Sequence, residues 1–188
     1  NGMEPDVGVY ENSVKVTGGV KALRGCRSFP QGWIDPKTGK DGEDGRMNLG
    51  VVTVNIPRIA LEAHGDVDRF WKIFDERMEV AHQALQFRIM RCKQATPVNA
   101  PTLFRYGAFG RLEPNENVDQ LFRNERATVS LGYIGLYEAT SVFYGKNWMR
   151  DHGWDPQGKD FALSIVKRMN ELCKEWSKAE GYHYSVYS

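Results

Sequence analysis

The sequence lacks the features that assign a chain to several specialised classes of protein. Its 25 basic and 24 acidic residues give a formal net charge of +1, without the basic surplus typical of proteins that bind nucleic acid or anionic membranes. No apolar run approaches the roughly 20 residues that cross a bilayer. The start, NGMEPDVGVY, is neither basic nor apolar enough for a signal peptide. We therefore expect a cytoplasmic protein that binds no membrane and no nucleic acid.

Cysteine is also scarce and widely spaced. The three cysteines, Cys26, Cys92 and Cys173, form no C-x-x-C pair, and their number is odd. This pattern argues against a disulfide framework and against a structural zinc site, so we expect no bound metal. Cys92 and Cys173 fall near the ends of expected helices and are predicted to be reduced thiols that pack as small core or surface residues.

Several short stretches have the pattern of β-strands. The apolar run VVTV, which ends before Pro57, predicts a strand that is buried on both faces. The stretch ATVSLGYIGLYEATSVFYG predicts a strand that leads into a helix, with close approach allowed at Gly132 and Gly135. The alternating YHYSVYS at the end predicts a last strand. Weaker patterns predict strands over Val14–Val16 and Lys21–Leu23, and a strand with a turn within Thr102–Arg111.

Two long amphipathic helices are expected between these strands. Asp66 is the expected N-cap of a helix that extends to about Arg91, and Gly181 is expected to end a second helix over Gln157–Glu180. The apolar stripes are Val67, Phe70, Phe74, Met78, Ala81, Leu85 and Ile89 in the first helix and Phe161, Ile165, Met169, Leu172, Trp176 and Ala179 in the second. Strands that alternate with amphipathic helices predict an α/β fold with a partly parallel sheet. Because the chain ends within a strand, we expect one segment of a larger fold.

The stretch RGCRSF places a lone cysteine after a glycine, which suits a loop tip that approaches a ligand closely. Cys26 is open to three interpretations. It could fill a turn as a small residue, or it could be a nucleophilic thiolate favoured by Arg24 and Arg27. It could also be a thiol that transfers a hydrogen atom, which needs no base. No histidine lies near it in the sequence, and this disfavours a Cys–His pair.

Four separated blocks resemble the anaerobic (class III) ribonucleoside-triphosphate reductases. The blocks are GCRSF, GRMNLGVVTVNIPRIALE, RATVSLGYIGLYE and the terminal YSVYS, in the family's order and at compatible distances. The resemblance implies an α/β fold that is part of a ten-stranded glycyl-radical-enzyme barrel, with a finger loop over about residues 18–48 that carries Cys26. Residues 1–188 would be a single segment of this catalytic barrel domain, without the family's regulatory nucleotide-binding region and C-terminal glycyl-radical domain.

The same resemblance implies a radical reaction at Cys26. A transient thiyl on this residue would remove the 3′-hydrogen of the ribose, and the 2′-hydroxyl would then leave as water. A neutral, shielded thiol suits this role, so we expect Arg24 and Arg27 to point away from the sulfur and to bind carboxylates or carbonyls. Arg24 departs from the family, which usually has methionine at this position.

The resemblance also implies a set of substrate-binding residues. Asn48 matches an asparagine that lies against the ribose hydroxyls, and an amide can both donate to and accept from a diol. Alternatively, Asn48 only begins a strand. Gly25 matches the loop tip, while Tyr187 and Ser188 match the start of a loop that holds the nucleotide, although Tyr187 could be an ordinary strand residue. Asn55 would face away from Asn48 in a regular strand and is expected to form structural hydrogen bonds.

For the complete enzyme, the resemblance implies a glycyl radical on a segment or partner chain outside this sequence, and formate as the reductant. SAM and an iron–sulfur cluster would belong only to a separate radical-SAM activase, and this segment itself would bind no cofactor. The expected partners are a ribonucleoside triphosphate, complementary chains of the same reductase and the activase. The complete enzyme would be a homodimer in the cytoplasm of a bacterium or a phage-infected cell.

Two other functions fit the sequence. One is a catalytically inactive fragment that serves as a scaffold or binds nucleotide, which would suit the departure at Arg24. The other is a different glycyl-radical enzyme. Formate-lyases usually carry adjacent cysteines at the loop tip, so the single Cys26 disfavours that class.

Overall fold

The computed structural model describes residues 11, 14–15, 33–34, 38–39, 41–42, 46–150 and 153–187. Its centre is a parallel sheet of three strands in the order β3-β4-β7. The strands are β3 (Met47–Asn55), β4 (Ala127–Ile134) and β7 (His183–Tyr187). The fold is therefore α/β with parallel pairing, as the sequence predicts.

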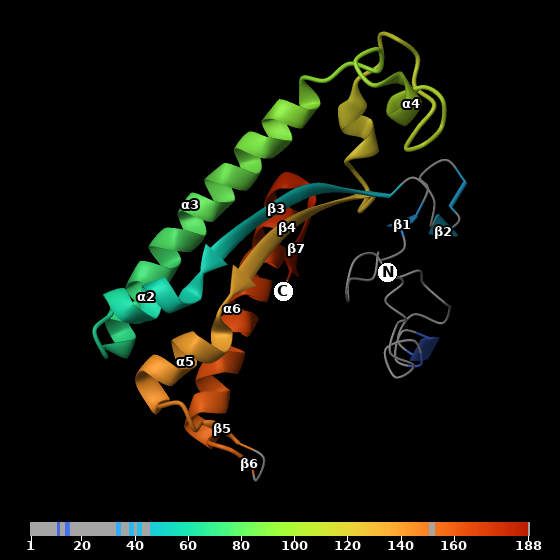
Figure 1. The fold of residues 1–188 in the computed structure, drawn as a ribbon. Helices are drawn as coiled ribbons and strands as arrows, with labels where there is room; N and C mark the ends of the chain where they lie inside the picture. Colours follow the sequence, from blue (N-terminus) through green and yellow to red (C-terminus); the bar gives the residue numbers. More distant parts are fainter. Residues whose placement is uncertain are drawn as a thin grey trace.

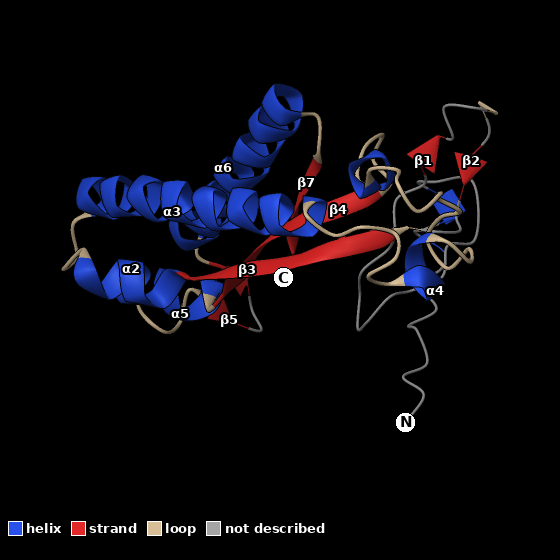
Figure 2. Ribbon diagram, turned by 90° about the horizontal axis from the view of Figure 1, so that it is seen from above, coloured by secondary structure: helices blue, strands red, loops and turns tan. Residues whose placement is uncertain are grey.

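Two long helices connect and cover these strands. They are α3 (Val67–Lys93) and α6 (Pro156–Glu180). Parallel crossovers are right-handed, and both crossovers step in the same direction across the sheet, so both helices lie on one face of it. Figure 1 shows the long helix α3 beside β3 and β4, and Figure 2 shows the same arrangement from above. The other face of the sheet carries neither of these helices.

Shorter elements complete the described part of the chain. They are β1 (Trp33–Ile34), β2 (Asp41–Gly42), α2 (Ile56–Glu62), α4 (Pro101–Phe104), the 3₁₀ helix η1 (Val118–Leu121), α5 (Leu136–Tyr144), β5 (Met149–Arg150) and β6 (Gly153–Trp154). β1 pairs with β2, and β5 pairs with β6, in two small antiparallel ladders. No described helix is long and apolar enough to span a membrane.

The core lies between the sheet and the two long helices. The predicted apolar stripe of α3 is buried from Phe70 to Ile89, and the N-cap Asp66 accepts a hydrogen bond from the Arg69 backbone N–H at 3.0 Å. On α6, Cys173 is buried in the stripe, whereas the expected member Ala179 is exposed. The αL residue Gly181 ends α6, as predicted.

Three sequence-based predictions about strands are wrong. The residues Val14 and Lys15 are helical, while Val16 and Lys21–Leu23 lie outside the described residues. The predicted turn within Thr102–Arg111 is present after α4, but the predicted strand is not, because the backbone N–H groups of Phe109 and Gly110 bond back to the Leu103 carbonyl.

The third error concerns β3, which is not buried on both faces. Only Met47 and Val54 of this strand are buried, while Asn48, Thr53 and Asn55 are exposed. The cause is that both helices cover the same face of the sheet. Of the three valines of β3, Val54 is therefore buried, whereas Val51 and Val52 are half-buried.

Candidate functional site

The face of the sheet opposite the two long helices carries mainly polar side chains. We call it the open face. Strand register aligns its side chains in three rows. The rows are Asn48, Thr128 and His183; Val51, Ser130 and Ser185; and Thr53, Gly132 and Tyr187.

A β-bulge in β3 decides which residues reach the open face. Asn48 pairs with Thr128 and Val51 pairs with Ser130, so β3 uses one more residue than β4 over this interval. Gly50 lies inside the bulge with φ of 114°, a conformation that favours glycine. Because of the bulge, Asn48 before it and Val51 after it pair with alternate residues of β4, and both side chains face the same side of the sheet.

The bulge corrects the predicted orientation of Asn55. Asn48 and Asn55 align with Thr128 and Ile134, which lie an even number of steps apart on β4, so both asparagines face the same side. The expected structural role of Asn55 is confirmed, because its side-chain oxygen accepts the Arg58 backbone N–H at 3.1 Å and caps α2.

Two hydrogen bonds hold the Asn48 side chain. Its Nδ2 donates to the Ser130 hydroxyl at 2.9 Å, and its Oδ1 accepts the Gly50 backbone N–H at 2.7 Å. Ser130 is only 2% exposed, whereas the Asn48 residue is exposed. An amide has two N–H donors and two acceptor positions, so one donor and one acceptor position of Asn48 remain beyond these two bonds.

Arg46 organises the edge of the sheet where the strands begin. This guanidinium is 2% exposed and donates to the Glu125 carbonyl through Nη2 at 2.7 Å and Nε at 3.2 Å. Its Nη2 also donates to Thr128 Oγ1 at 3.2 Å. Arg46 was not predicted from the sequence, although it precedes Asn48 within the GRMN block. A buried arginine that ties the start of β3 to the chain before β4 fixes the row in which Asn48 lies.

His183 is the third member of that row. Burial lowers its pKa, and the positive charge of Arg46 lowers it further, while Glu125 acts in the opposite direction. The imidazole is therefore neutral at pH 7. The rows of the open face thus present amide, hydroxyl and neutral imidazole groups, and no carboxylate belongs to them.

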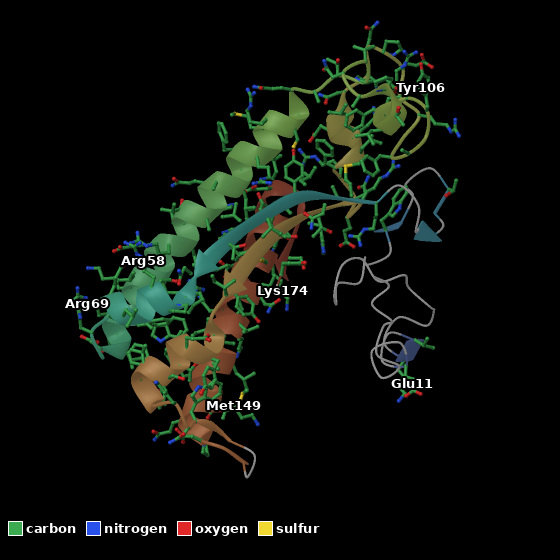
Figure 3. The ribbon with its side chains drawn as sticks, in the orientation of Figure 1. Glu11, Arg58, Arg69, Tyr106, Met149 and Lys174 are labelled. Carbon is green, nitrogen blue, oxygen red and sulfur yellow. The ribbon has the colours of Figure 1, made fainter. Side chains whose placement is uncertain are left out.

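Tyr187 lies on the same face as Asn48 but far from it. It pairs with Gly132, whereas Asn48 pairs with Thr128, and these positions on β4 are about 13 Å apart at about 3.3 Å per residue. Tyr187 is 39% exposed. Figure 3 shows Arg58, which follows the end of β3, and Tyr106, near α4, on opposite sides of the sheet along the strand direction. Asn48 and Tyr187 could therefore contact only different parts of an extended ligand.

The remaining predicted site residues, Gly25, Cys26 and Ser188, lie outside the described residues, as do Arg24 and Arg27. The two described cysteines are free thiols, as predicted. Cys173 is buried in α6, and burial raises the pKa of its thiol to about 12, while Cys92 is half-buried in the last turn of α3. Within the described ranges, no three His, Cys, Asp or Glu side chains gather in a way that could hold a metal ion.

Comparisons with known proteins identify relatives of nearly the whole chain. A family model described as anaerobic ribonucleoside-triphosphate reductase matches residues 3–188. The anaerobic ribonucleoside-triphosphate reductase of Haemophilus influenzae is 45% identical over 187 residues, which cover 99% of this chain and 26% of the relative. The protein of the same name in Salmonella typhimurium is 42% identical over the same shares, and that of phage T4 is 38% identical and covered to 29%.

Solved structures share the fold. The anaerobic ribonucleotide reductase of Thermotoga maritima with citrate in the active site superposes with a TM-score of 0.56 at 20% identity, over 76% of this chain and 24% of that one. The structure of the same enzyme in complex with dATP and CTP gives a TM-score of 0.53 at 21% identity.

The chain thus spans about a quarter of the length of the curated relatives that it matches. The match extends through all four sequence blocks and includes the strands that carry Asn48, Ser130 and Tyr187. This chain belongs to the anaerobic ribonucleoside-triphosphate reductase family.

Proposed function

We propose that this chain is the thiyl-bearing portion of an anaerobic ribonucleotide reductase, which converts ribonucleoside triphosphates to deoxyribonucleoside triphosphates together with complementary chains. Family membership supports the reaction class. The observation that carries the proposal is the side chain of Asn48, which two hydrogen bonds hold on a sheet face lined by neutral polar groups. Cys26, at the tip of the proposed finger loop, supplies the sulfur.

In the proposed reaction, Asn48 binds the ribose diol and thereby positions the 3′-carbon against the Cys26 sulfur. The Cys26 thiyl takes the 3′-hydrogen atom, which leaves a carbon-centred radical on the sugar. The 2′-hydroxyl then leaves as water after it gains a proton. Two electrons and a proton reduce the sugar when formate is oxidised to carbon dioxide, and Cys26 returns the hydrogen atom to the 3′-carbon.

The residues of the open face suit this chemistry. Hydrogen-atom transfer needs a neutral thiol and no general base, and amide and hydroxyl groups bind a diol without changing its protonation state. A glycyl radical on a segment or chain outside this sequence would supply the one-electron oxidising equivalent. Tyr187 and Ser188 are proposed to contact the nucleotide end of the substrate, and Gly25 allows the loop tip to approach the ribose.

The complementary chains are proposed to complete the barrel. Among the described residues, β3 and β7 each pair on one side only, with β4, and so form the two edges of the sheet. Further strands on both edges would extend the sheet toward the proposed ten-stranded barrel, and the open face would then line its interior. We also propose that a radical-SAM activase and a second copy of the complete enzyme are partners.

Turnover of a ribonucleoside triphosphate by the complete, activated reductase tests the role of Asn48. We expect Asn48→Ala to lower kcat/KM by about 10²-fold, because the 3′-carbon is no longer held against the sulfur. Asn55→Asp is the matched control, because aspartate keeps the cap of α2 and lies at the far end of β3. Unchanged turnover by Asn48→Ala would contradict the proposal. A wild-type assembly that binds nucleotide but never turns over would favour an inactive scaffold.

A further inference from the structure

We propose that Ser130 is a positioning residue that acts through Asn48, and that it and the Gly50 bulge together set the preference for ribose. This inference rests on the proposed function, because it assumes that Asn48 contacts the sugar. It adds the residues that orient the asparagine. Neither Ser130 nor Gly50 would contact the substrate themselves.

The two hydrogen bonds leave the Asn48 amide only one orientation. The Gly50 backbone N–H can only donate, so the atom of the amide that lies 2.7 Å from it must be the oxygen. The nitrogen consequently faces the Ser130 hydroxyl, which accepts at 2.9 Å. A flipped amide would place an N–H against an N–H and would lose the first bond. The two partners come from different strands, so the rotation of the side chain is fixed as well.

The bulge is what brings the Gly50 N–H to Asn48. Gly50 has φ of 114°, and the side chain of Arg88 fills the space that a Cβ at this position would need. A residue with a side chain would therefore be strained in this backbone conformation, and the end of the Arg88 side chain would have to move aside. In a regular strand with the same sequence, Asn48 and Val51 would be three residues apart without a bulge between them. Their side chains would then face opposite sides of the sheet.

Ser130 suits a positioning role because it is buried and small. It is 2% exposed, and it lies in the central strand between Val51 on β3 and Ser185 on β7. A buried hydroxyl cannot exchange its partner for water, so its bond to Asn48 persists when no substrate is present. The free N–H and the free acceptor position of Asn48 then have a fixed geometry. One donor and one acceptor match a vicinal diol, in which one hydroxyl accepts while the other donates.

The test measures the binding of two nucleotides to the complete, unactivated reductase that contains this chain. The probes are a ribonucleoside triphosphate and its 2′,3′-dideoxy counterpart, and the readout is the ratio of their Kd values. We expect Ser130→Ala to lower the preference for the ribonucleotide about three- to tenfold, which corresponds to one neutral hydrogen bond, while the Kd of the dideoxy compound stays unchanged. Loss of packing alone would weaken both ligands equally.

Ser164→Ala is the matched control, because Ser164 lies on α6, away from the open face, and its hydroxyl donates to the Phe161 carbonyl at 2.6 Å. Asn48→Ala should lower the preference at least as much as Ser130→Ala does. Adding Ser130→Ala to Asn48→Ala should have no further effect, because Ser130 acts only through the asparagine. If Ser130→Ala fails to assemble, Ser130→Cys keeps the size, offers only a weak acceptor, and should show the same loss.

Two results would overturn the inference, and they differ in what they say about the proposed function. An unchanged preference in Ser130→Ala, together with a loss in Asn48→Ala, would show that Asn48 binds the sugar without help from Ser130. An unchanged preference in Asn48→Ala would reject the proposed sugar contact itself, and the positioning role would fall with it.

Discussion

At the scale of single residues, Gly132 determines how the side chains of the open face fit together. A Cβ at this position would lie 2.8 Å from Thr53 Oγ1 and 2.9 Å from Val51 Cγ1, closer than real Cβ atoms approach other atoms. Both neighbours lie on β3, and the Thr53 backbone lies close behind them. The absence of a side chain at Gly132 therefore allows the side chains of β3 to cover the centre of the sheet.

Gly132→Ala should destabilise the chain by about 1–3 kcal/mol, because the added methyl group overpacks the open face. The change in the free energy of unfolding can be measured by urea titration. Val51→Ala introduced in the same chain should recover part of the loss, because it removes one of the two clashing groups. Equal stability of Gly132→Ala and the wild type would contradict the close packing described here.

At the scale of elements, a half-buried polar cluster joins α3, α6 and β7 on the covered side of the sheet. Glu180 Oε1 lies 2.6 Å from His82 Nε2 and accepts from Gln86 at 2.7 Å, and its Oε2 accepts from the Tyr184 hydroxyl at 2.5 Å. The His82 ring stacks on Trp176 at 4.1 Å. Burial alone would raise the pKa of Glu180, but the hydrogen bonds outweigh it and lower the pKa below its ordinary value of 4.5.

This cluster predicts an acid-sensitive stability. Because the pKa of Glu180 is lower in the folded chain, the stabilisation is fully present above about pH 4.5 and is lost as the pH falls through the lowered pKa. Glu180→Gln should reduce the free energy of unfolding by about 1–2 kcal/mol at pH 7 and by less at pH 4. Urea titrations at both pH values measure the two differences.

The control for this prediction is Glu175→Gln, which removes an exposed carboxylate from the same helix. It should leave the free energy of unfolding nearly unchanged at both pH values. A loss in Glu180→Gln that is the same at pH 7 and at pH 4 would show that shape, rather than charge, accounts for the role of Glu180.

The elements also show what could be predicted from the sequence. The caps and stripes of α3 and α6 are local signals, so Asp66 and Gly181 mark helix ends correctly. The orientation of Asn55 was missed because a bulge depends on the register between two strands, which one strand's pattern does not contain. The partner of Asn48 was missed for the same reason, since Ser130 lies 82 positions away.

At the scale of the whole molecule, the described sheet has one covered face and one open face, and only the open face carries residues of the proposed site. The family assignment spans residues 3–188, although these amount to about a quarter of the relatives' length. Under the proposed function, this chain binds substrate and turns it over as part of an assembly that completes the barrel. The proposed partner of the open face is the loop that carries Cys26.

Anaerobic turnover by the complete, activated reductase with Cys26→Ala in this chain tests the central claim most directly. Formation of deoxyribonucleotide from a ribonucleoside triphosphate is measured beside Cys92→Ala, which changes a half-buried thiol in the last turn of α3. We expect Cys26→Ala to abolish turnover while assembly and nucleotide binding are unchanged, and Cys92→Ala to remain active. Continued formation of deoxyribonucleotide by Cys26→Ala would contradict the account.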